Sequence, residues 1–177
     1  MGWDGSEGAD EGRDEVVAGF LGREFLLWLW YRSEVGFGRL QGATGEEIDL
    51  WIDDRLVLRG EGKDAQRFDL RGGAPATSSA AHAALREGRH VSAARLGIRV
   101  VESEFSCELH EDLTLRSIKL PDGMDVDDDP LRARGMLLDD LHDRLDDLYE
   151  AFSQVRLAPG WDRAEVPRIL RWLADEE

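Results

Sequence analysis

The sequence predicts an α+β fold in which an antiparallel sheet of five to six strands packs with an N-terminal core helix, a long acidic helix and a short C-terminal helix. The middle of the chain alternates apolar and polar residues, whereas both ends have helical periodicity. The 177 residues, 42 % hydrophobic, suffice to bury a real core. We expect residues 14–177 to form one α+β domain and residues 1–13 to form a disordered acidic tail.

The first predicted helix, residues 15–33, contains the most apolar part of the chain. Apolar residues recur along it at three- and four-residue steps, and Asp14 is a candidate N-cap. Residues 25–31 are apolar on all sides, which favours a buried core helix over an exposed binding surface and predicts that Trp28 and Trp30 are buried. A membrane span is excluded, because charged residues close the run before it reaches the roughly 20 residues that a bilayer requires.

The segments after this helix alternate between apolar and polar residues, as strands of a half-buried sheet do. Residues 46–60 predict a hairpin that turns at residues 53–55. Residues 65–73 predict a short third strand with Phe68 and Leu70 facing inward.

A short helix and a meander of three strands come next. Residues 75–88 are rich in alanine, with Thr77 or Ser78 as a candidate N-cap and Gly88 as a stop signal. Three alternating segments follow between residues 94 and 120 and end in turn chemistry. With the earlier strands they make one or two curved antiparallel sheets.

The last third of the chain is helical in pattern. A helix over residues 129–156 carries an apolar seam at heptad spacing, and acidic residues fill the positions between. We expect the seam to pack mainly inside the chain, with its edge as a candidate homodimer contact. An intermolecular coiled coil is the alternative. The seam consists of Leu138, Leu141, Leu145, Leu148, Phe152 and Val155.

A final short helix has a full set of start signals. Asp162 is the expected N-cap, Glu165 completes a capping box, and Trp161 and Val166 occupy the hydrophobic-staple positions. We expect this helix to bury one apolar face. That face consists of Val166, Ile169, Leu170 and Leu173.

Nothing in the sequence supports catalysis, a metal site or a cofactor, so we expect a protein that is not an enzyme. The four histidines lack the spacing of metal ligands, and the single Cys107 excludes an internal disulfide and a cysteine-based zinc site. Asp125, Asp127 and Asp129 resemble the start of a calcium loop whose remaining positions do not fit. No phosphate-binding, dinucleotide-binding or nucleophile-elbow motif is present. Because no signal peptide is visible, we expect a cytoplasmic protein without a membrane role.

Charge is the most informative functional feature. The formal net charge of −16 repels duplex DNA and anionic lipid unless the charge is segregated. Arginines dominate residues 66–101, whereas acidic residues dominate residues 125–150. The alternative to a free basic face is that these arginines pair with the acidic helix, within the chain or across a dimer. The candidate contacts for nucleic acid or a partner are Arg86, Arg89, Arg95 and Arg99.

A family resemblance rests on six segments spread over the chain. The most distinctive is the aromatic helix FLGREFLLWLWYRSE at residues 20–34. The others are LRGGAP at 70–75, AALREGR at 83–89, LTLRSIKLP at 113–121, LYEAFSQVRLAPGW at 148–161 and VPRILRWL at 166–173. In this order they resemble the C-terminal portion of bacterial RdgC-like, recombination-associated proteins. The resemblance implies a non-enzymatic, dimeric, ring-forming DNA-binding protein that restrains recombinase action.

Two functions follow as expectations. The first, implied by the resemblance, is a non-catalytic accessory protein linked to DNA recombination or nucleoid function, which binds DNA weakly and without sequence preference. The second is an acidic protein–protein adaptor that docks a basic partner and does not bind nucleic acid. A basic concave face would favour the first, whereas a basic patch fully covered by the acidic helix of the same chain would favour the second.

Overall fold

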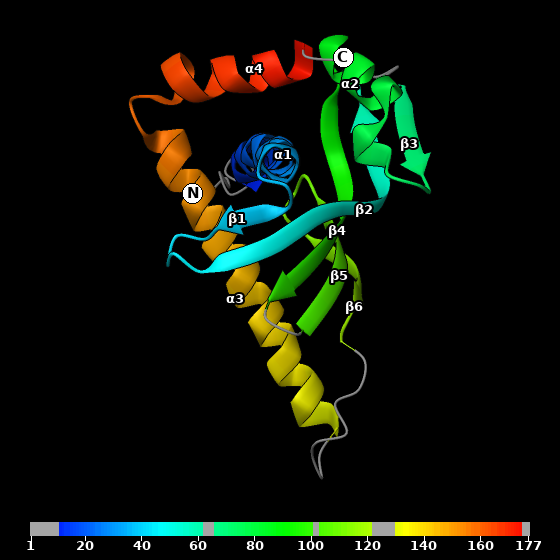
Figure 1. The fold of residues 1–177 in the computed structure, drawn as a ribbon, viewed down its shortest axis with the longest axis vertical. Coiled ribbons are helices and arrows are strands. Elements are labelled where there is room, and N and C mark those ends of the chain that lie inside the picture. The colour runs from blue at the N-terminus through cyan, green and yellow to red at the C-terminus, as the bar shows by residue number, and fades with distance from the viewer. Residues whose placement is uncertain (1–10, 62–65, 101–102, 122–129, 175–177) are drawn as a thin grey trace, which may run out of the picture.

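A computed structural model of the chain describes residues 11–61, 66–100, 103–121 and 130–174 (Figure 1). The predicted α+β class is confirmed: a six-stranded antiparallel sheet packs with helices from both ends of the chain. The strand order is β1-β2-β4-β5-β6, and β3 also pairs with β2. The elements are α1 (Glu11–Val35), β1 (Arg39–Gln41), β2 (Glu47–Arg59), β3 (Arg67–Arg71), the 3₁₀ turn η1 (Pro75–Thr77), α2 (Ser79–Arg86), β4 (His90–Val100), β5 (Ser103–His110), β6 (Leu115–Lys119), α3 (Pro130–Leu157), the π-helical turn η2 (Trp161–Glu165) and α4 (Val166–Ala174).

α1 is the central helix of the core and lies between the sheet on one side and α3 and α4 on the other (Figure 1). Trp28 and Trp30, 3 % and 0 % exposed, are both buried as predicted. The helix begins at Glu11, so Asp14 lies inside it and the predicted N-cap is wrong. Residues 11–13, which were predicted to belong to the tail, are thus part of the helix. Residues 1–10 of the predicted tail lie outside the described part of the chain.

Gly22 lets α1 approach the sheet closely. A Cβ at this position would overlap the backbone carbonyl of Glu111, in the turn between β5 and β6. The side chain of Glu111 accepts a hydrogen bond of 2.6 Å from Nε of Arg23, the next residue of α1. Helix and sheet therefore meet through a backbone contact and an ion pair at the same point.

β2 is one continuous strand of 13 residues, so the predicted hairpin turn at residues 53–55 is wrong. Opposite β4 its register jumps, since Ile52 pairs with Leu96 whereas Leu56 pairs with Ala94. The extra residues of β2 bulge out of the ladder. Asp53 and Asp54, which have the composition of a turn, fit within the strand because they lie in this bulge. The pair reaches outward, while the flanking apolar residues keep facing the core.

β6 closes one edge of the sheet and is irregular. In its pairing with β5, Ser106 lies opposite Lys119 and Glu108 lies opposite Arg116, which leaves one extra residue on β6. Ser117, inside this interval, has a φ of 51°, a left-handed conformation that is uncommon for residues other than glycine. β6 therefore carries a bulge that bends the strand and interrupts its ladder.

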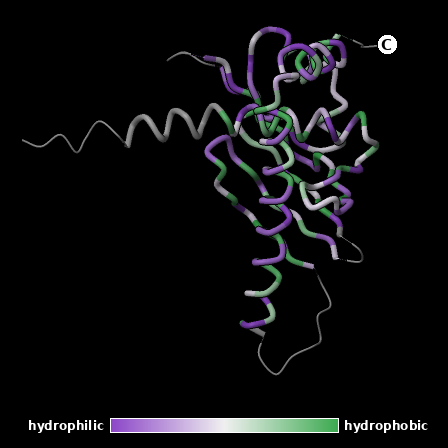
Figure 2. The backbone as a smooth tube through the Cα atoms, turned by 90° about the vertical axis from the view of Figure 1, so that its left-hand side faces the viewer, coloured by the Kyte–Doolittle hydropathy of each residue, from purple (hydrophilic) through white to green (hydrophobic). Residues whose placement is uncertain are grey.

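α3 packs its apolar seam mainly inside the chain, as expected. Phe152 contacts Phe25 of α1 at 5.4 Å between ring centroids. The two ends of the seam, Leu138 and Val155, are half-buried. The first turns of α3 project past the sheet (Figure 2). A homodimer through α3 stays a prediction and has only the ends of the seam available, because the central residues are buried within this chain. These central residues are Leu141, Leu145, Leu148 and Phe152.

The last helix begins differently from the prediction. Asp162 lies inside the π-helical turn η2, Gly160 precedes that turn, and no side chain caps it. The cause is Pro167, which has no N–H and whose ring would clash with a carbonyl four residues earlier in a regular helix. The wider turn rotates α4, so Leu170 is 59 % exposed instead of buried, and Trp172 packs against the core in its place.

The remaining short elements follow the sequence pattern, except that the predicted inward position of Phe68 is wrong. Ser78 precedes α2 at the N-cap position without a side-chain hydrogen bond, and Gly88 has a φ of 85° just beyond the helix. On β3, Leu70 packs against the core, but Phe68 is 36 % exposed and lies beneath the guanidinium of Arg89. In the described ranges, each helix is too short or too polar to cross a bilayer.

Candidate functional site

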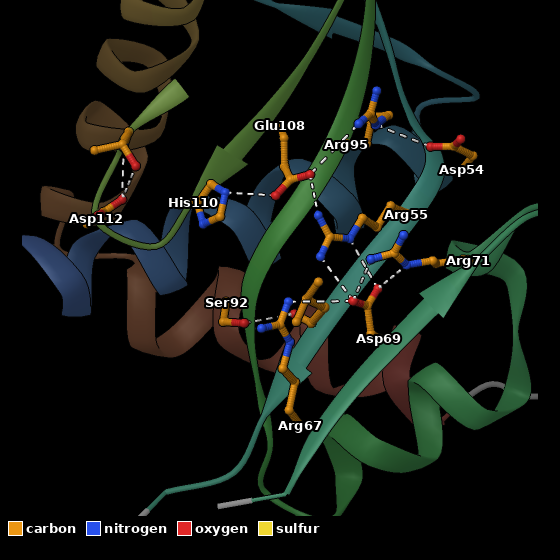
Figure 3. A network of polar contacts seen from close by, with 12 residues as sticks. Asp54, Arg55, Arg67, Asp69, Arg71, Ser92, Arg95, Glu108, His110 and Asp112 are labelled. Atoms are coloured by element: carbon orange, nitrogen blue, oxygen red, sulfur yellow. Dashed lines mark hydrogen bonds and ion pairs between the residues drawn. The ribbon is translucent and has the colours of Figure 1, made fainter. Parts of the chain in front are cut away.

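The candidate site is the face of the sheet that points away from α1. On β4 and β5, Leu96 and Cys107 point into the core, whereas Arg95 and Glu108 point to the other side. Figure 3 shows these polar side chains in front of the strands, with α1 behind them. We call this surface the outward face. It includes Trp51, Asp54, Arg55, Arg67, Asp69, Arg71, Arg95, Arg99, Glu104, Glu108 and His110.

Glu108 is the buried centre of the outward face, with a side chain only 6 % exposed. Its carboxylate accepts a hydrogen bond of 2.5 Å from Nη1 of Arg55 and lies 2.8 Å from Nε2 of His110 and 3.9 Å from Nη2 of Arg95. Burial alone would raise the pKa of Glu108, but the hydrogen bonds and charges of Arg55 and His110 together outweigh burial and hold this pKa below its ordinary value. The carboxylate therefore stays ionised and fully engaged, which suits a fixed framework better than proton transfer.

Asp69 of β3 is the second centre. Its two oxygens accept paired hydrogen bonds from Arg55, at 3.1 and 3.0 Å, and from Arg71, both at 3.1 Å. Arg67 lies 3.5 Å away. The hydrogen bond from Arg55, followed by that from Arg71, lowers the pKa of Asp69 far below its usual range. Because Arg55 bridges Asp69 and Glu108, the two centres form one network across β3, β2 and β5 (Figure 3).

Trp51 forms an aromatic platform on the same face. Its indole lies across Gly97 of β4, where a Cβ would overlap the ring. The guanidinium of Arg99 lies 5.4 Å from the ring centroid and donates a hydrogen bond of 2.7 Å to Glu104. Glycine at position 97 is thus what allows a large, half-buried aromatic ring to lie flat on the strands.

The four arginines that the sequence singles out do not form one basic face. Arg95 and Arg99 share the outward face, and each has a carboxylate partner there, Asp54 at 3.3 Å and Glu104 at 2.7 Å. Arg86 donates to the backbone carbonyl of Leu173 in α4. These three arginines are therefore engaged within the chain, but by the sheet and α4 and not by the acidic helix α3 that the alternative named.

Arg89, the fourth of these arginines, lies between α2 and β4, away from the outward face. It pairs with Glu87 at 2.8 Å and stacks over Phe68, whose ring centroid is 4.4 Å from the guanidinium carbon. Its positive charge is therefore partly neutralised and its planar group is occupied by an aromatic ring.

Residues 110–112 form a run of three titratable side chains, at the end of β5 and in the turn after it, and these side chains point apart in the structure. His110 faces Glu108, whereas Glu111 turns to the helix side and lies 3.1 Å from His90. Burial lowers the pKa of His90, and the nearby charge of Arg23 lowers it further. Among the described residues no three His, Cys, Asp or Glu side chains are placed to share a metal ion. The acidic residues 125–129 lie outside the described part.

Cys107 is buried on the core side of β5. Burial raises the pKa of its thiol to about 12, so the sulfur stays protonated and unreactive at neutral pH. The arrangement around it offers packing and no chemistry.

Sequence reasoning missed the central residues of the network. Arg55 was assigned to a turn, and Glu108 sits between inward-facing Cys107 and Leu109 on a strand whose outer side was given no role. A signal was present, because strict alternation on neighbouring strands places Glu104 and Glu108 on the same face as Arg95 and Arg99. Recognising it requires the strand pairing, which the local pattern does not supply.

Comparisons with family models, with curated proteins and with solved structures give no match for this chain. The residues of the outward face must therefore carry any functional proposal by themselves.

Proposed function

We propose that this chain is a non-catalytic interaction module that docks a protein partner on the outward face of its sheet. One observation supports this most directly. The sheet side opposite α1 presents Trp51 and Arg99 as a stacked pair above a network of ion pairs that is fixed before any partner arrives. A pre-organised surface loses little conformational entropy on binding, which favours affinity.

The pairing of charges favours a protein over DNA. Phosphates bind arginines whose guanidinium groups are free to face them, but Arg55, Arg95 and Arg99 each have carboxylate partners on the same face. Displacing these carboxylates would leave Glu108 buried without its hydrogen bond, which is costly. The net charge of −16 adds long-range repulsion of a polyanion.

The chemistry of the face also resembles the centre of a protein interface. Tryptophan and arginine dominate the residues that contribute most to protein–protein affinity, especially where polar neighbours exclude water. Trp51 is half-buried and Arg99 lies over it with a side chain 50 % exposed, so both can lose further surface on docking. Charges of both signs surround them and could pair with a partner of complementary pattern.

A role in DNA recombination remains a prediction from the family resemblance. It is compatible with the proposal, because an accessory protein can act on recombination by holding another protein and need not touch DNA. Direct DNA binding is therefore an outcome of the test below.

The test places a photo-crosslinking amino acid at Glu104 on the outward face, and in a second protein at Glu150 on the exposed side of α3. Each is expressed in the cell that naturally makes the chain. We expect position 104 to give one crosslinked protein species that position 150 does not give. This species should disappear when Trp51→Ala and Arg99→Ala are combined. Arg163→Ala, an exposed arginine of η2, is the matched control and should leave the crosslink unchanged.

A DNA titration at several salt concentrations separates the two classes of partner. We expect no saturable binding of duplex DNA at 50 mM salt. About four phosphate contacts would make the logarithm of the DNA affinity fall with the logarithm of the salt concentration with a slope of roughly −3 to −4. Binding with this slope that is lost in Arg99→Glu would overturn the protein proposal in favour of DNA. Equal crosslinking from positions 104 and 150 would also overturn it.

A further inference from the structure

A pocket of about 330 Å³ opens where α3 ends and α4 begins, on the far side of the molecule from the strands of the outward face (Figure 1). This volume lies at the lower end of the range for small-molecule sites. Its walls come from the last turn of α3 and from η2, and the side chain of Arg168 reaches its rim. The apolar wall residues are Val155, Ala158, Trp161 and Ala164.

The pocket owes its shape to the π-helical turn. The N–H of Val166 donates to the carbonyl of Trp161, five residues earlier, so this turn holds one residue more than an α-helical turn. The wider turn lets both Trp161 and Glu165 line the pocket although each is 93 % buried, with only 7 % exposed. Turns of this kind are frequent at functional sites.

Glu165 is the chemically distinctive residue of the pocket. Its Oε2 atom is buried, and no described residue donates a hydrogen bond to it. Its nearest cation is Arg168, three residues on, whose Nη1 lies 3.5 Å away and whose side chain is 58 % exposed. A buried carboxylate oxygen without a hydrogen-bond donor is unfavourable, so a donor that enters the pocket would be bound favourably.

The walls define what kind of donor fits. Aliphatic and indole surface suits an apolar stem, and the single carboxylate suits one positively charged N–H group at the end of that stem. An anionic group would be repelled by Glu165. A metal ion would find only this one carboxylate among the described residues that line the pocket.

We propose that this pocket binds a primary alkylammonium group, with Glu165 as the acceptor of its N–H bonds and the apolar walls around its stem. Arg168 shares Glu165 in the ligand-free protein and turns to solvent when the ammonium group enters. Such a group occurs on free aliphatic amines and on lysine side chains of proteins. The inference is independent of the outward face.

The experiment titrates the ¹⁵N-labelled protein with hexylammonium chloride and follows the indole N–H signal of Trp161 by NMR. Hexanol and sodium hexanoate serve as neutral and anionic ligands of the same length. We expect a saturable shift with hexylammonium, at least tenfold weaker binding of hexanol and no binding of hexanoate. No saturable shift with hexylammonium, or equal affinity for all three, would overturn the proposal.

Variants locate the site. Glu165→Gln should weaken hexylammonium binding at least tenfold, and Arg168→Gln should strengthen it several-fold because a competitor for the carboxylate is removed. Ala164→Leu fills the pocket from an exposed position and should abolish binding without unfolding the protein. Ala80→Leu, an exposed alanine of α2, is its matched control. Unchanged binding in both Glu165→Gln and Ala164→Leu, or an equal loss in Ala80→Leu, contradicts the assignment.

A second titration with Nα-acetyl-lysine methylamide identifies the source of the amine. Tighter binding of this lysine analogue than of hexylammonium assigns the pocket to a lysine side chain of a protein. Tighter binding of hexylammonium assigns it to a free aliphatic amine. Both results support an alkylammonium site, whereas an absence of binding by both ligands overturns it.

Discussion

The indole of Trp172 in α4 donates a hydrogen bond of 2.7 Å to Oε2 of Glu34, near the end of α1. Trp30 donates to the other oxygen of the same carboxylate, also at 2.7 Å. The imidazole of His82 in α2 packs against both indoles, with ring centroids 5.0 Å from Trp172 and 5.2 Å from Trp30. One carboxylate therefore joins the first helix, α2 and the last helix in a single aromatic cluster.

Trp172→Phe tests this junction. The change keeps an aromatic ring but leaves Glu34 with one hydrogen-bond donor fewer, so we expect the free energy of unfolding to fall by about 2 kcal/mol. Urea denaturation followed by circular dichroism measures the loss. Leu170→Ala, the exposed neighbour on α4, should change stability by less than about 0.5 kcal/mol. A larger effect at Leu170 than at Trp172 would mean that α4 buries the face predicted from the sequence, with Leu170 pointing into the core.

Trp28→Ala tests the central position of α1. The ring packs against Phe25 and Phe152 in the core, and its loss should lower the free energy of unfolding by about 3–5 kcal/mol. Phe37→Ala, at a residue 94 % exposed, is the aromatic control and should have almost no effect. If the Trp28 variant unfolds at the same urea concentration as the parent, α1 is a surface helix.

Gly22→Ala and Gly135→Ala form a matched pair, because both glycines lie inside helices. At Gly22 the new methyl group meets the backbone of Glu111, so we expect destabilisation of about 1–3 kcal/mol. At Gly135 of α3 the space is open, and the higher helix propensity of alanine should stabilise the protein by about 1 kcal/mol. Thermal unfolding of the two variants should therefore shift in opposite directions, and shifts of the same sign would contradict the close approach of α1 to the sheet.

Asp69→Asn tests the outward network through its pH dependence. In the unfolded chain the carboxyl group has its ordinary pKa near 3.8, and in the folded protein Arg55 and Arg71 lower this pKa. The unfolded state therefore binds the proton more readily, so the contribution of Asp69 is complete above about pH 3.8 and is lost as pH falls towards the folded pKa.

The variant should lose about 1 kcal/mol at pH 7, and its difference from the parent should shrink below about pH 3.8. Urea unfolding at pH 7, 4 and 2.5 measures this. Asp143→Asn, exposed on α3, is the control and should follow the parent at each pH. A difference that grows on acidification has the wrong sign for a carboxylate stabilised by arginines.

Features that depend on residue spacing along the chain were predictable, and features that depend on pairing were not. The buried face of α1 and the seam of α3 follow from helical periodicity, and the core side of β4 follows from alternation. The bulge at residues 53–55 has the composition of a turn, and only the register against β4 shows otherwise. The network around Glu108 joins side chains from three strands, and its central pair, Arg55 and Glu108, is 53 positions apart in the chain. No local pattern of residues reveals such a pairing.

The end of the chain was mispredicted for a different reason. Asp162 and Glu165 have the composition of a capping box, but Pro167 prevents the regular turn that would use it. With Asp162 as the N-cap, Pro167 would be the fifth residue of the helix, where its missing N–H and its ring oppose a regular turn. The predicted start signals took no account of this proline. The pocket beside Trp161 follows from this turn and was equally hidden.

The bulge at Ser117 on β6 also bears on how the protein behaves when it is crowded. A long, flat strand at the rim of a sheet is a template on which a second molecule can add its own strand, and repeated addition leads to fibres. The left-handed residue bends β6 after only a few ladder bonds, so a second molecule finds no straight row of backbone groups to extend. Along this rim the bulge therefore removes the straight row of backbone groups that the addition of a further strand requires.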